Sequence, residues 1–151
     1  MNDQPTGRPA RPAPRLADYP HRVADNIRFA DLDPQGHVNQ AVFLTYFETG
    51  RVAMFRDRDL GIGVPGATFV LVRMEVDYLK ELHWPGAIEI GTRVAEFGRS
   101  SFSVAQAIFR DGACAASGRA TMVCIDLATR KATPLPEEAI ARLRQWKLQD
   151  R

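Results

Sequence analysis

The sequence predicts an α+β fold in which an antiparallel five-stranded sheet wraps around one long central helix. Three features support this prediction. An extended segment at residues 21–30 leads into a strongly patterned helix that begins near residue 40. After that helix, apolar and polar residues alternate with a period of two, which is typical of strands. The chain then ends in one short helical segment, and it lacks the repeated strand–helix units that predict a parallel sheet.

Length and composition predict one soluble domain. The 151 residues suffice for one hydrophobic core, and 45% hydrophobic with 25% charged residues is ordinary for a globular protein. The net charge of +2 is small and the basic residues are scattered, so we expect no nucleic-acid partner. We also expect no membrane association and no secretory signal, because long apolar runs are missing. Cys114 and Cys124 form no disulfide framework, which favours a reduced, cytoplasmic location.

Residues 1–20 are predicted to be a disordered tail. Five prolines and three arginines occur there with almost no large apolar side chains. Such a segment buries too little surface to offset its ordering entropy. A proline-rich docking peptide is the alternative interpretation. The folded domain is then expected over residues 21–148.

The first strand is expected over residues 21–30, and a tight acidic loop follows it. Pro34 biases Asp33 toward an extended conformation, so the strand should run up to this acid and stop. Gly36 then permits a sharp turn.

An apolar stripe and signals at both ends define the central helix. Asn39 is a good N-cap, Val38 and Phe43 can form a hydrophobic staple, and Gly61 can cap the C-terminus. Gly50 costs about 1 kcal/mol of helix propensity relative to Ala, so we expect a sheet or a ligand to approach closely there. The stripe, whose bulky aromatics predict the packed centre of the fold, comprises Val42, Phe43, Tyr46, Phe47, Gly50, Ala53 and Met54.

Alternation after the helix predicts four further strands. Asp111-Gly112 is a strong signal for a tight hairpin, and the small residues at 115–118 allow a close neighbour or a bulge. Pro136 opens a short terminal helix. One face of the first of these strands is expected to carry Val72, Met74, Val76 and Tyr78. The four strands are expected over residues 72–78, 88–97, 101–110 and 113–127.

The loop before the central helix is the strongest candidate for chemistry. Residues 31–39 place a carboxylate, an imidazole and an amide beside a helix N-terminus. Such a terminus offers free backbone N–H groups and a partial positive charge, which suit a developing oxyanion.

A metal site is not predicted for this loop. Asp31, Asp33 and Gly36 imitate the start of a calcium loop, but Val42 stands at the twelfth position, where a bidentate Glu is required. The histidines show no ligand-like spacing relative to one another, and the two cysteines lie ten residues apart.

Four motifs, at residues 29–39, 46–48, 77–79 and 97–101, carry a family resemblance. Through them, residues 21–130 resemble the single-domain hotdog-fold acyl-CoA thioesterases of the 4-hydroxybenzoyl-CoA thioesterase type. The resemblance implies hydrolysis of an acyl-CoA thioester to the free acid and coenzyme A, with no cofactor because coenzyme A is part of the substrate. It also implies a homodimer or homotetramer in which two subunits join their sheets and build each active site at the interface. The residues that carry it are Phe29-Ala30-Asp31-Leu32-Asp33-Pro34-Gln35-Gly36-His37-Val38-Asn39, Tyr46-Phe47-Glu48, Asp77-Tyr78-Leu79 and Phe97-Gly98-Arg99-Ser100-Ser101.

The same resemblance implies roles for single residues. Asp33 stands at the catalytic carboxylate position, as a nucleophile or as the base that activates water, and the backbone N–H of Gln40 is favoured as oxyanion donor. His37 either hydrogen-bonds the thioester or water, or braces the loop, and Asn39 is a helix cap or a catalytic contact. The candidate substrate-binding residues are Tyr46, which is also a core candidate, Glu48, Arg99, Ser100 and Ser101, with Lys80 as a weaker candidate.

The resemblance leaves several alternatives open. The His-Val-Asn triplet looks more like members that act on fatty or branched chains, and the carrier is either coenzyme A or acyl carrier protein. A non-catalytic acyl-CoA sensor would use the same fold, although the tail shows no helix-turn-helix pattern for DNA. An enoyl thioester hydratase is disfavoured because His37 follows Asp33 within a Pro/Gly loop. A phosphatase of the Asp-x-Asp type needs a larger parallel sheet.

Overall fold

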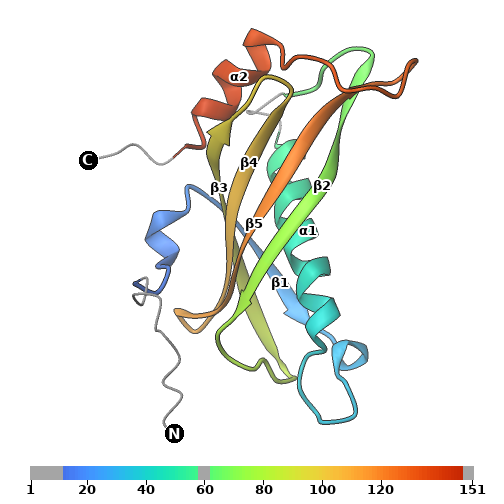
Figure 1. Ribbon diagram of the computed structural model, residues 1–151. Coiled ribbons are helices and arrows are strands. Elements are labelled where there is room, and N and C mark those ends of the chain that lie inside the picture. The colour runs from blue at the N-terminus through green and yellow to red at the C-terminus, as the bar shows by residue number, and fades with distance from the viewer. Residues whose placement is uncertain (1–11, 58–61, 148–151) are drawn as a thin grey trace, which may run out of the picture.

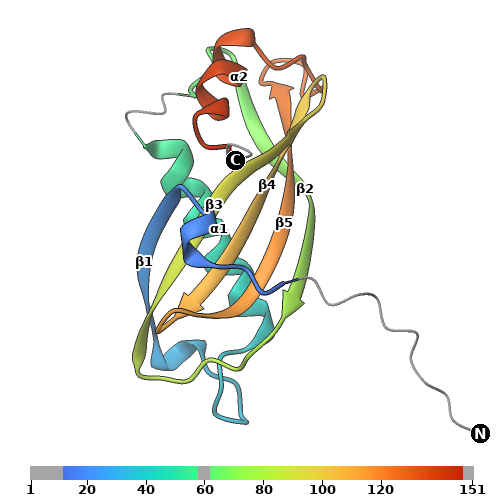
Figure 2. The same ribbon diagram turned by 90° about the vertical axis from the view of Figure 1, so that its left-hand side faces the viewer.

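The five strands form one antiparallel sheet, as predicted, and their order in the sheet is β1-β3-β4-β5-β2. The sheet curls around the long helix α1, and the short helix α2 lies at one end of the strands (Figures 1 and 2). The computed structural model describes residues 12–57 and 62–147. Its elements are the 3-10 helices η1 (Leu16–Asp18) and η2 (Phe29–Asp31), the strands β1 (His21–Ile27), β2 (Ala67–Tyr78), β3 (Gly86–Phe97), β4 (Ser101–Arg110) and β5 (Ala113–Asp126), and the helices α1 (Gln40–Arg56) and α2 (Glu137–Arg144).

The predicted N-terminal signals of α1 are confirmed. The side chain of Asn39 accepts a hydrogen bond of 2.9 Å from the N–H of Ala41, which makes it the N-cap. Val38 and Phe43 are both buried in the same core cluster. The helix ends at Arg56, and the expected cap Gly61 lies outside the described residues.

The middle of α1 packs very closely on the sheet. A Cβ atom added to Gly50 would lie 2.5 Å from Cγ2 of Ile90 and 2.9 Å from Nε2 of Gln106. The predicted close approach at Gly50 is therefore confirmed, and the sheet is its cause. Tyr46, Phe47 and other aromatic and aliphatic residues of the stripe fill the space on either side of this contact.

Two strand boundaries differ from the prediction by three residues or more, while β3 begins at Gly86, two residues earlier than expected. β1 stops at Ile27 rather than at residue 30, because the chain turns into η2, where the Asp31 carboxylate accepts the N–H of Arg28 at 2.8 Å. β2 begins at Ala67, and its register against β5 shifts between Leu71 and Arg73. This bulge breaks the expected shared face, since Val72 is exposed whereas Met74 and Val76 are partly buried.

The predicted turn chemistry is confirmed in the hairpin that joins β4 to β5. Asp111 has a φ of 49° and Gly112 a φ of 77°, so both central residues take the left-handed conformation that two-residue hairpins require. The small residues after it also behave as expected. The β4–β5 register shifts near Phe109, and a Cβ on Gly118 would lie 2.7 Å from Cε of Met74.

The predicted boundary of the N-terminal tail is wrong for its last residues. Tyr19 is buried, with its ring 5.8 Å from that of Phe109 and against Gly91, and η1 precedes it. An aromatic side chain near the end of the proline-rich segment therefore belongs to the core. Residues 1–11 lie outside the described part of the chain. None of the described helices is long and apolar enough to cross a membrane.

We expect Gly50→Ala to lower the free energy of unfolding by about 2 kcal/mol, because overpacking against Ile90 outweighs the gain in helix propensity. Chemical denaturation measures this change. Gly63→Ala is the matched control, since a Cβ there meets no atom within 4 Å. The control should change stability by less than about 0.5 kcal/mol. Equal effects of the two substitutions would contradict the close-packing argument.

Candidate active site

Backbone hydrogen bonds close the loop at residues 31–39 into a tight turn. The N–H of Asp33 donates to the carbonyl of His37 at 2.9 Å, and the N–H of Gly36 donates to the carbonyl of Asp33 at 3.0 Å. Gly36 has a φ of 86°, so the predicted need for glycine at this turn is confirmed. The loop ends where the N–H of Asn39 donates to the carbonyl of Asp31 at 2.9 Å.

The Asp33 carboxylate and the His37 imidazole lie side by side on this turn. Oδ1 of Asp33 accepts the N–H of Gln35 at 2.8 Å, and Oδ2 lies 3.4 Å from Nδ1 of His37. The two side chains are 18% and 25% exposed, so each is partly shielded yet reachable by a small molecule. A carboxylate and an imidazole in this arrangement can take and pass a proton.

A cavity of about 510 Å³ opens beside these two side chains. All four predicted catalytic residues line it, which are Asp33, His37, Asn39 and Gln40. The cavity also reaches Phe43 on α1 and the segment that follows β2. The remaining lining residues are Gln35, Val38, Tyr78, Leu79, Lys80 and Glu81.

Gln40 is the first residue of α1, so its backbone N–H lies at the positive end of the helix. The neighbouring N–H of Ala41 is bonded to the Asn39 side chain, and that of Val42 to the Asn39 carbonyl. The hydrogen bonds found in the described parts of the chain include none from the N–H of Gln40. This donor is therefore available to an oxygen atom in the cavity.

Sequence reasoning gave no site role to Tyr78 or Glu81. The Tyr78 phenol donates to the carbonyl of Gln40 at 2.9 Å, and its ring lies 5.2 Å from that of Phe43. Glu81 lies on the opposite side of His37 from Asp33, with Oε1 3.8 Å from Nε2 of His37. The Asp77-Tyr78-Leu79 motif was a signal for Tyr78, whereas the position of Glu81 depends on a loop that sequence patterns do not place.

His83 joins this cluster without completing a metal site. Its Nε2 lies 3.5 Å from Oε2 of Glu81, and its ring centroid lies 6.2 Å from that of His37. Residues 12–57 and 62–147 contain no group of three or more His, Cys, Asp or Glu side chains arranged to hold a metal ion.

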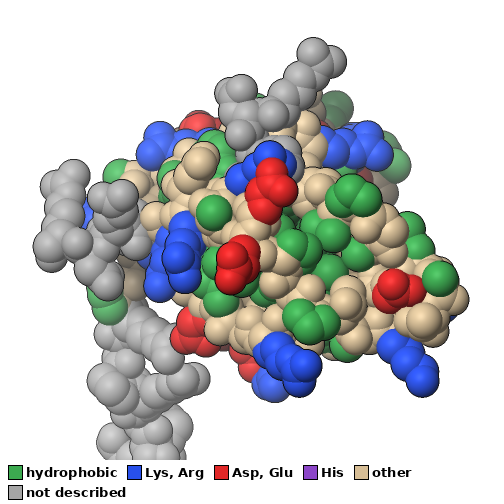
Figure 3. Space-filling view, turned by 90° about the horizontal axis from the view of Figure 1, so that it is seen from above, with side chains coloured by type: hydrophobic (Ala, Val, Ile, Leu, Met, Phe, Trp, Pro, Cys, Tyr) green, Lys and Arg blue, Asp and Glu red, His purple; other side chains and the backbone are tan. Residues whose placement is uncertain are grey.

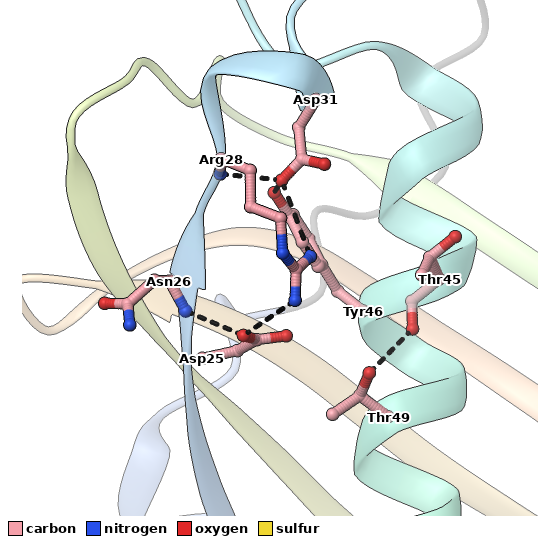
Figure 4. Close-up of polar contacts among 7 residues, drawn as sticks. All are labelled: Asp25, Asn26, Arg28, Asp31, Thr45, Tyr46 and Thr49. Atoms are coloured by element: carbon pink, nitrogen blue, oxygen red, sulfur yellow. Dashed lines mark hydrogen bonds and ion pairs between the residues drawn. The ribbon is translucent and has the colours of Figure 1, made fainter.

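The Asp31 side chain supports the loop at residues 31–39 through its contacts with Arg28 and Tyr46 (Figure 4). Its buried carboxylate accepts the Tyr46 hydroxyl at 2.6 Å and the N–H of Arg28 at 2.8 Å, and the Arg28 guanidinium lies 4.0 Å away. Burial, and next the hydrogen bond to Asp31, raise the pKa of Tyr46 well above its usual range. The Asp31 carboxylate is therefore held by one backbone N–H group and one phenol.

The predicted substrate-binding role of Tyr46 disagrees with its position. Its side chain has no exposed surface, its hydroxyl is bonded to Asp31, and it does not line the cavity. An amphipathic aromatic on the helix was correctly expected to pack in the core. The Tyr46 hydroxyl faces the Asp31 carboxylate and not the cavity.

Of the other predicted substrate-binding residues, Lys80 lines the cavity, whereas the remaining four lie away from it within one chain. Glu48 is exposed on α1, two turns beyond Gln40. Arg99 and Ser100 belong to the β3–β4 turn at the far end of the sheet, and Ser101 begins β4 there. The 12 residues of β3 separate them from the loop at residues 31–39. At about 3.3 Å per residue, this strand places the two ends about 35 Å apart. Lys and Arg side chains are exposed at the end that carries α2 (Figure 3).

Comparisons with known proteins identify the family. The model of the thioesterase-like superfamily matches residues 27–143. The chain belongs to this superfamily. A 1,4-dihydroxy-2-naphthoyl-CoA hydrolase from Synechococcus elongatus is 26% identical over 136 residues, which cover 87% of this chain and 96% of the relative.

Solved structures agree with this assignment. A thioesterase from Thermus thermophilus, solved with coenzyme A and Zn, is 37% identical with a TM-score of 0.77, covering 88% of this chain and 98% of the other. The PA5185 protein from Pseudomonas aeruginosa is 26% identical with a TM-score of 0.81, covering 93% of this chain and 100% of the other. The predicted hotdog fold is thereby confirmed, and the chain is a thioester hydrolase.

We expect Tyr46→Phe to lower the free energy of unfolding by about 1–3 kcal/mol, because the buried Asp31 carboxylate loses a donor that water cannot replace. Thermal or urea unfolding at neutral pH measures this loss. Tyr78→Phe is the matched control, since its phenol is half exposed and its partner can bond to water instead. A loss no greater than that of the control would show that Asp31 is held adequately without Tyr46.

Proposed function

We propose that this thioester hydrolase cleaves an acyl-CoA to the free acid and coenzyme A in the cavity beside Asp33. The observation that carries the proposal is the partly shielded Asp33 carboxylate, which faces the same cavity as the unbonded N–H of Gln40. Coenzyme A as carrier is supported by the relative named a CoA hydrolase and by the Thermus thioesterase solved with coenzyme A.

Asp33 performs the proton or nucleophile chemistry in this proposal. As a base, its carboxylate takes one proton of a water molecule while the water oxygen bonds to the thioester carbon. The C–S bond then breaks with its electron pair on sulfur, and the proton on Asp33 neutralises the thiolate. As a nucleophile, Asp33 would first form an anhydride with the acyl group while the C–S bond breaks and coenzyme A leaves as the thiolate. Water then opens the anhydride, which releases the free acid, restores the carboxylate and supplies the proton that neutralises the thiolate. In both mechanisms, the imidazole of His37 holds the carboxylate in place, since its Nδ1 lies 3.4 Å from Oδ2 of Asp33.

Oxyanion stabilisation is assigned to the N-terminus of α1. The carbonyl oxygen gains charge as the tetrahedral centre forms, and a fixed N–H group stabilises it without reorganisation. The N–H of Gln40 is the candidate donor, and the helix dipole adds a partial positive charge. The Tyr78 phenol holds the Gln40 carbonyl at 2.9 Å and so keeps this peptide group in place. Asn39 serves this end of the helix as its cap.

We further propose that a second copy completes the site. β2 is an edge strand of 12 residues, and such an edge is usually paired or protected. The exposed apolar residues Leu71, Val72, Tyr78 and Leu79 lie on it or directly after it. Antiparallel pairing of two β2 strands sets the Ala67 end of one beside the Tyr78 end of the other. The exposed Arg99 turn of the second copy then lies at the end of the sheet where Asp33 is.

This arrangement gives the remaining candidate residues a role. Arg99, Ser100 and Ser101 of one copy would bind the anionic nucleotide of coenzyme A whose acyl group enters the cavity of the other. Glu48 would face the same interface.

Acyl carrier protein is the alternative carrier, and a non-catalytic sensor is disfavoured by the family assignment. A cytoplasmic location is part of the proposal, supported by the free thiols of Cys114 and Cys124.

Asp33→Asn tests the catalytic assignment, because Asn keeps the shape of Asp without its basicity. We expect kcat to fall by roughly two orders of magnitude, about 2.7 kcal/mol in the barrier, while binding of an unreactive acyl-CoA analogue is retained. Steady-state kinetics over a panel of aliphatic and aromatic acyl-CoAs, with calorimetric binding, provide the measurement. Glu89→Gln, which removes an exposed carboxylate from β3, is the control and should leave kcat unchanged. A normal kcat in Asp33→Asn would exclude the carboxylate from catalysis.

Val72→Arg tests the completed site. A charged side chain on the β2 edge opposes pairing, so we expect the variant to sediment as a 16.8 kDa monomer with little activity. The wild type should sediment as a multiple of that mass. Ala24→Arg is the control on the opposite edge strand β1, where residue 24 is also exposed, and should preserve both mass and activity. An active wild-type monomer would contradict the proposal that a second copy completes the site.

A further inference from the structure

One wall of the cavity is the segment at residues 79–86, which comprises the connection from β2 to β3 and the first residue of β3. Leu79, Lys80 and Glu81 line the cavity directly. Leu82 follows with its side chain buried, and its carbonyl accepts the N–H of Val38 at 2.8 Å. This wall segment (residues 79–86) therefore also supports the loop that carries Asp33 and His37.

The end of the β4–β5 hairpin anchors both ends of the wall segment. At its start, the N–H groups of Leu79 and Lys80 both donate to the carbonyl of Ala115, at 2.8 and 3.0 Å. At its end, Arg110 donates Nη1 to the carbonyl of His83 and Nη2 to the carbonyl of Pro85, the latter at 2.9 Å. One guanidinium thus holds two carbonyl groups that bracket Trp84.

Arg110 also fits tightly against the start of β3. A Cβ atom on Gly86 would lie 2.6 Å from Cζ of Arg110, so the guanidinium occupies the space that any other residue at 86 would need. The Arg110 side chain is 31% exposed, and its Nε lies 3.8 Å from the carboxylate of the almost fully exposed Asp111. Its position as the last residue of β4 is set by the hairpin turn that follows.

We propose that Arg110 is a positioning residue for hydrolysis, which fixes the wall segment so that Glu81 and Leu82 hold the Asp33–His37 loop in place. The inference rests on the proposed function, because it concerns the rate of that reaction. Arg110 does not line the cavity itself. Its effect passes through the His83 and Pro85 carbonyls to Leu82 and from there to Val38.

Arg110→Met tests the proposal, because Met has comparable length but no donor for the two carbonyls. A displacement of about 1 Å at a reacting group can cost up to about a hundredfold in rate, so we expect kcat to fall at least about tenfold with a smaller change in KM. Arg110→Lys, which still donates to carbonyls, should recover part of kcat. Arg119→Met is the matched control. That arginine bonds to Ser103 and Glu96 on the same sheet, away from the wall segment.

Gly86→Ala provides an independent route to the same displacement, because the new methyl group expels the guanidinium. If both substitutions act on one contact, the double variant should lose no more kcat than Arg110→Met alone. Multiplicative losses would show that Arg110 acts elsewhere. A loss of thermal stability with unchanged kcat at 25 °C would reduce Arg110 to a structural residue and overturn the proposal.

Trp84 gives a readout that does not depend on activity. It lies between the two carbonyls, and Trp146→Phe would leave it as the sole tryptophan of the chain. We expect acrylamide to quench Trp84 more strongly in Arg110→Met than in the Arg119→Met control. Unchanged quenching would contradict the anchoring. If the wild type hydrolyses no acyl-CoA of the panel but quenching responds as expected, the proposed function fails while the anchoring stands.

Discussion

The buried carboxylate of Asp31 is the interaction on which the site geometry depends. It receives the N–H of Arg28 at the end of β1 and the hydroxyl of Tyr46 from the second turn of α1. The carbonyl of the same residue receives the N–H of Asn39, which starts the helix. One residue therefore ties the end of a strand to both the beginning and the body of the helix. A buried carboxylate is stable only when such donors are present, so the structure around it has little freedom.

The sequence contains strong local signals for the elements that this carboxylate joins. Alternation located the strands, Asp111-Gly112 located a hairpin, and Asn39 located the start of α1. These signals are predictive because each depends on neighbours only a few residues away. The same locality explains the early end of β1. A side chain-to-backbone bond between Asp31 and Arg28 competes with extension, and the apolar pattern of residues 27–30 gives no sign of it.

The candidate site could be predicted only where it is continuous in sequence. Asp33, His37, Asn39 and Gln40 occur on one loop, and the structure places all of them around one cavity. Tyr78 and Glu81 reach that cavity from a segment about 40 residues later, through sheet pairing that no single motif encodes. Arg99 shows the opposite case, because its motif was visible but one chain leaves it at the far end of β3. A motif identifies which residues matter, whereas topology and assembly decide which of them meet.

A second polar network fixes the middle of α1. The Arg51 guanidinium is buried and donates to Oε1 of Gln106 at 3.0 Å, while Nε2 of Gln106 donates to the carbonyl of Phe47 at 2.9 Å and to Oγ1 of Thr92 at 3.0 Å. Burial lowers the pKa of Arg51, because removing the guanidinium from water disfavours its charged form.

That network is possible only because Gly50 lets the helix approach the strands, and its bonds are lost if the helix slides or rotates. Asp31 fixes α1 near its first turns, and Gln106 fixes it near its middle. Two fixed points define a helix axis. The position of the Gln40 N–H at the start of α1 is therefore set by the core of the protein. Under the proposed function, this packing supplies the preorganisation that oxyanion stabilisation requires.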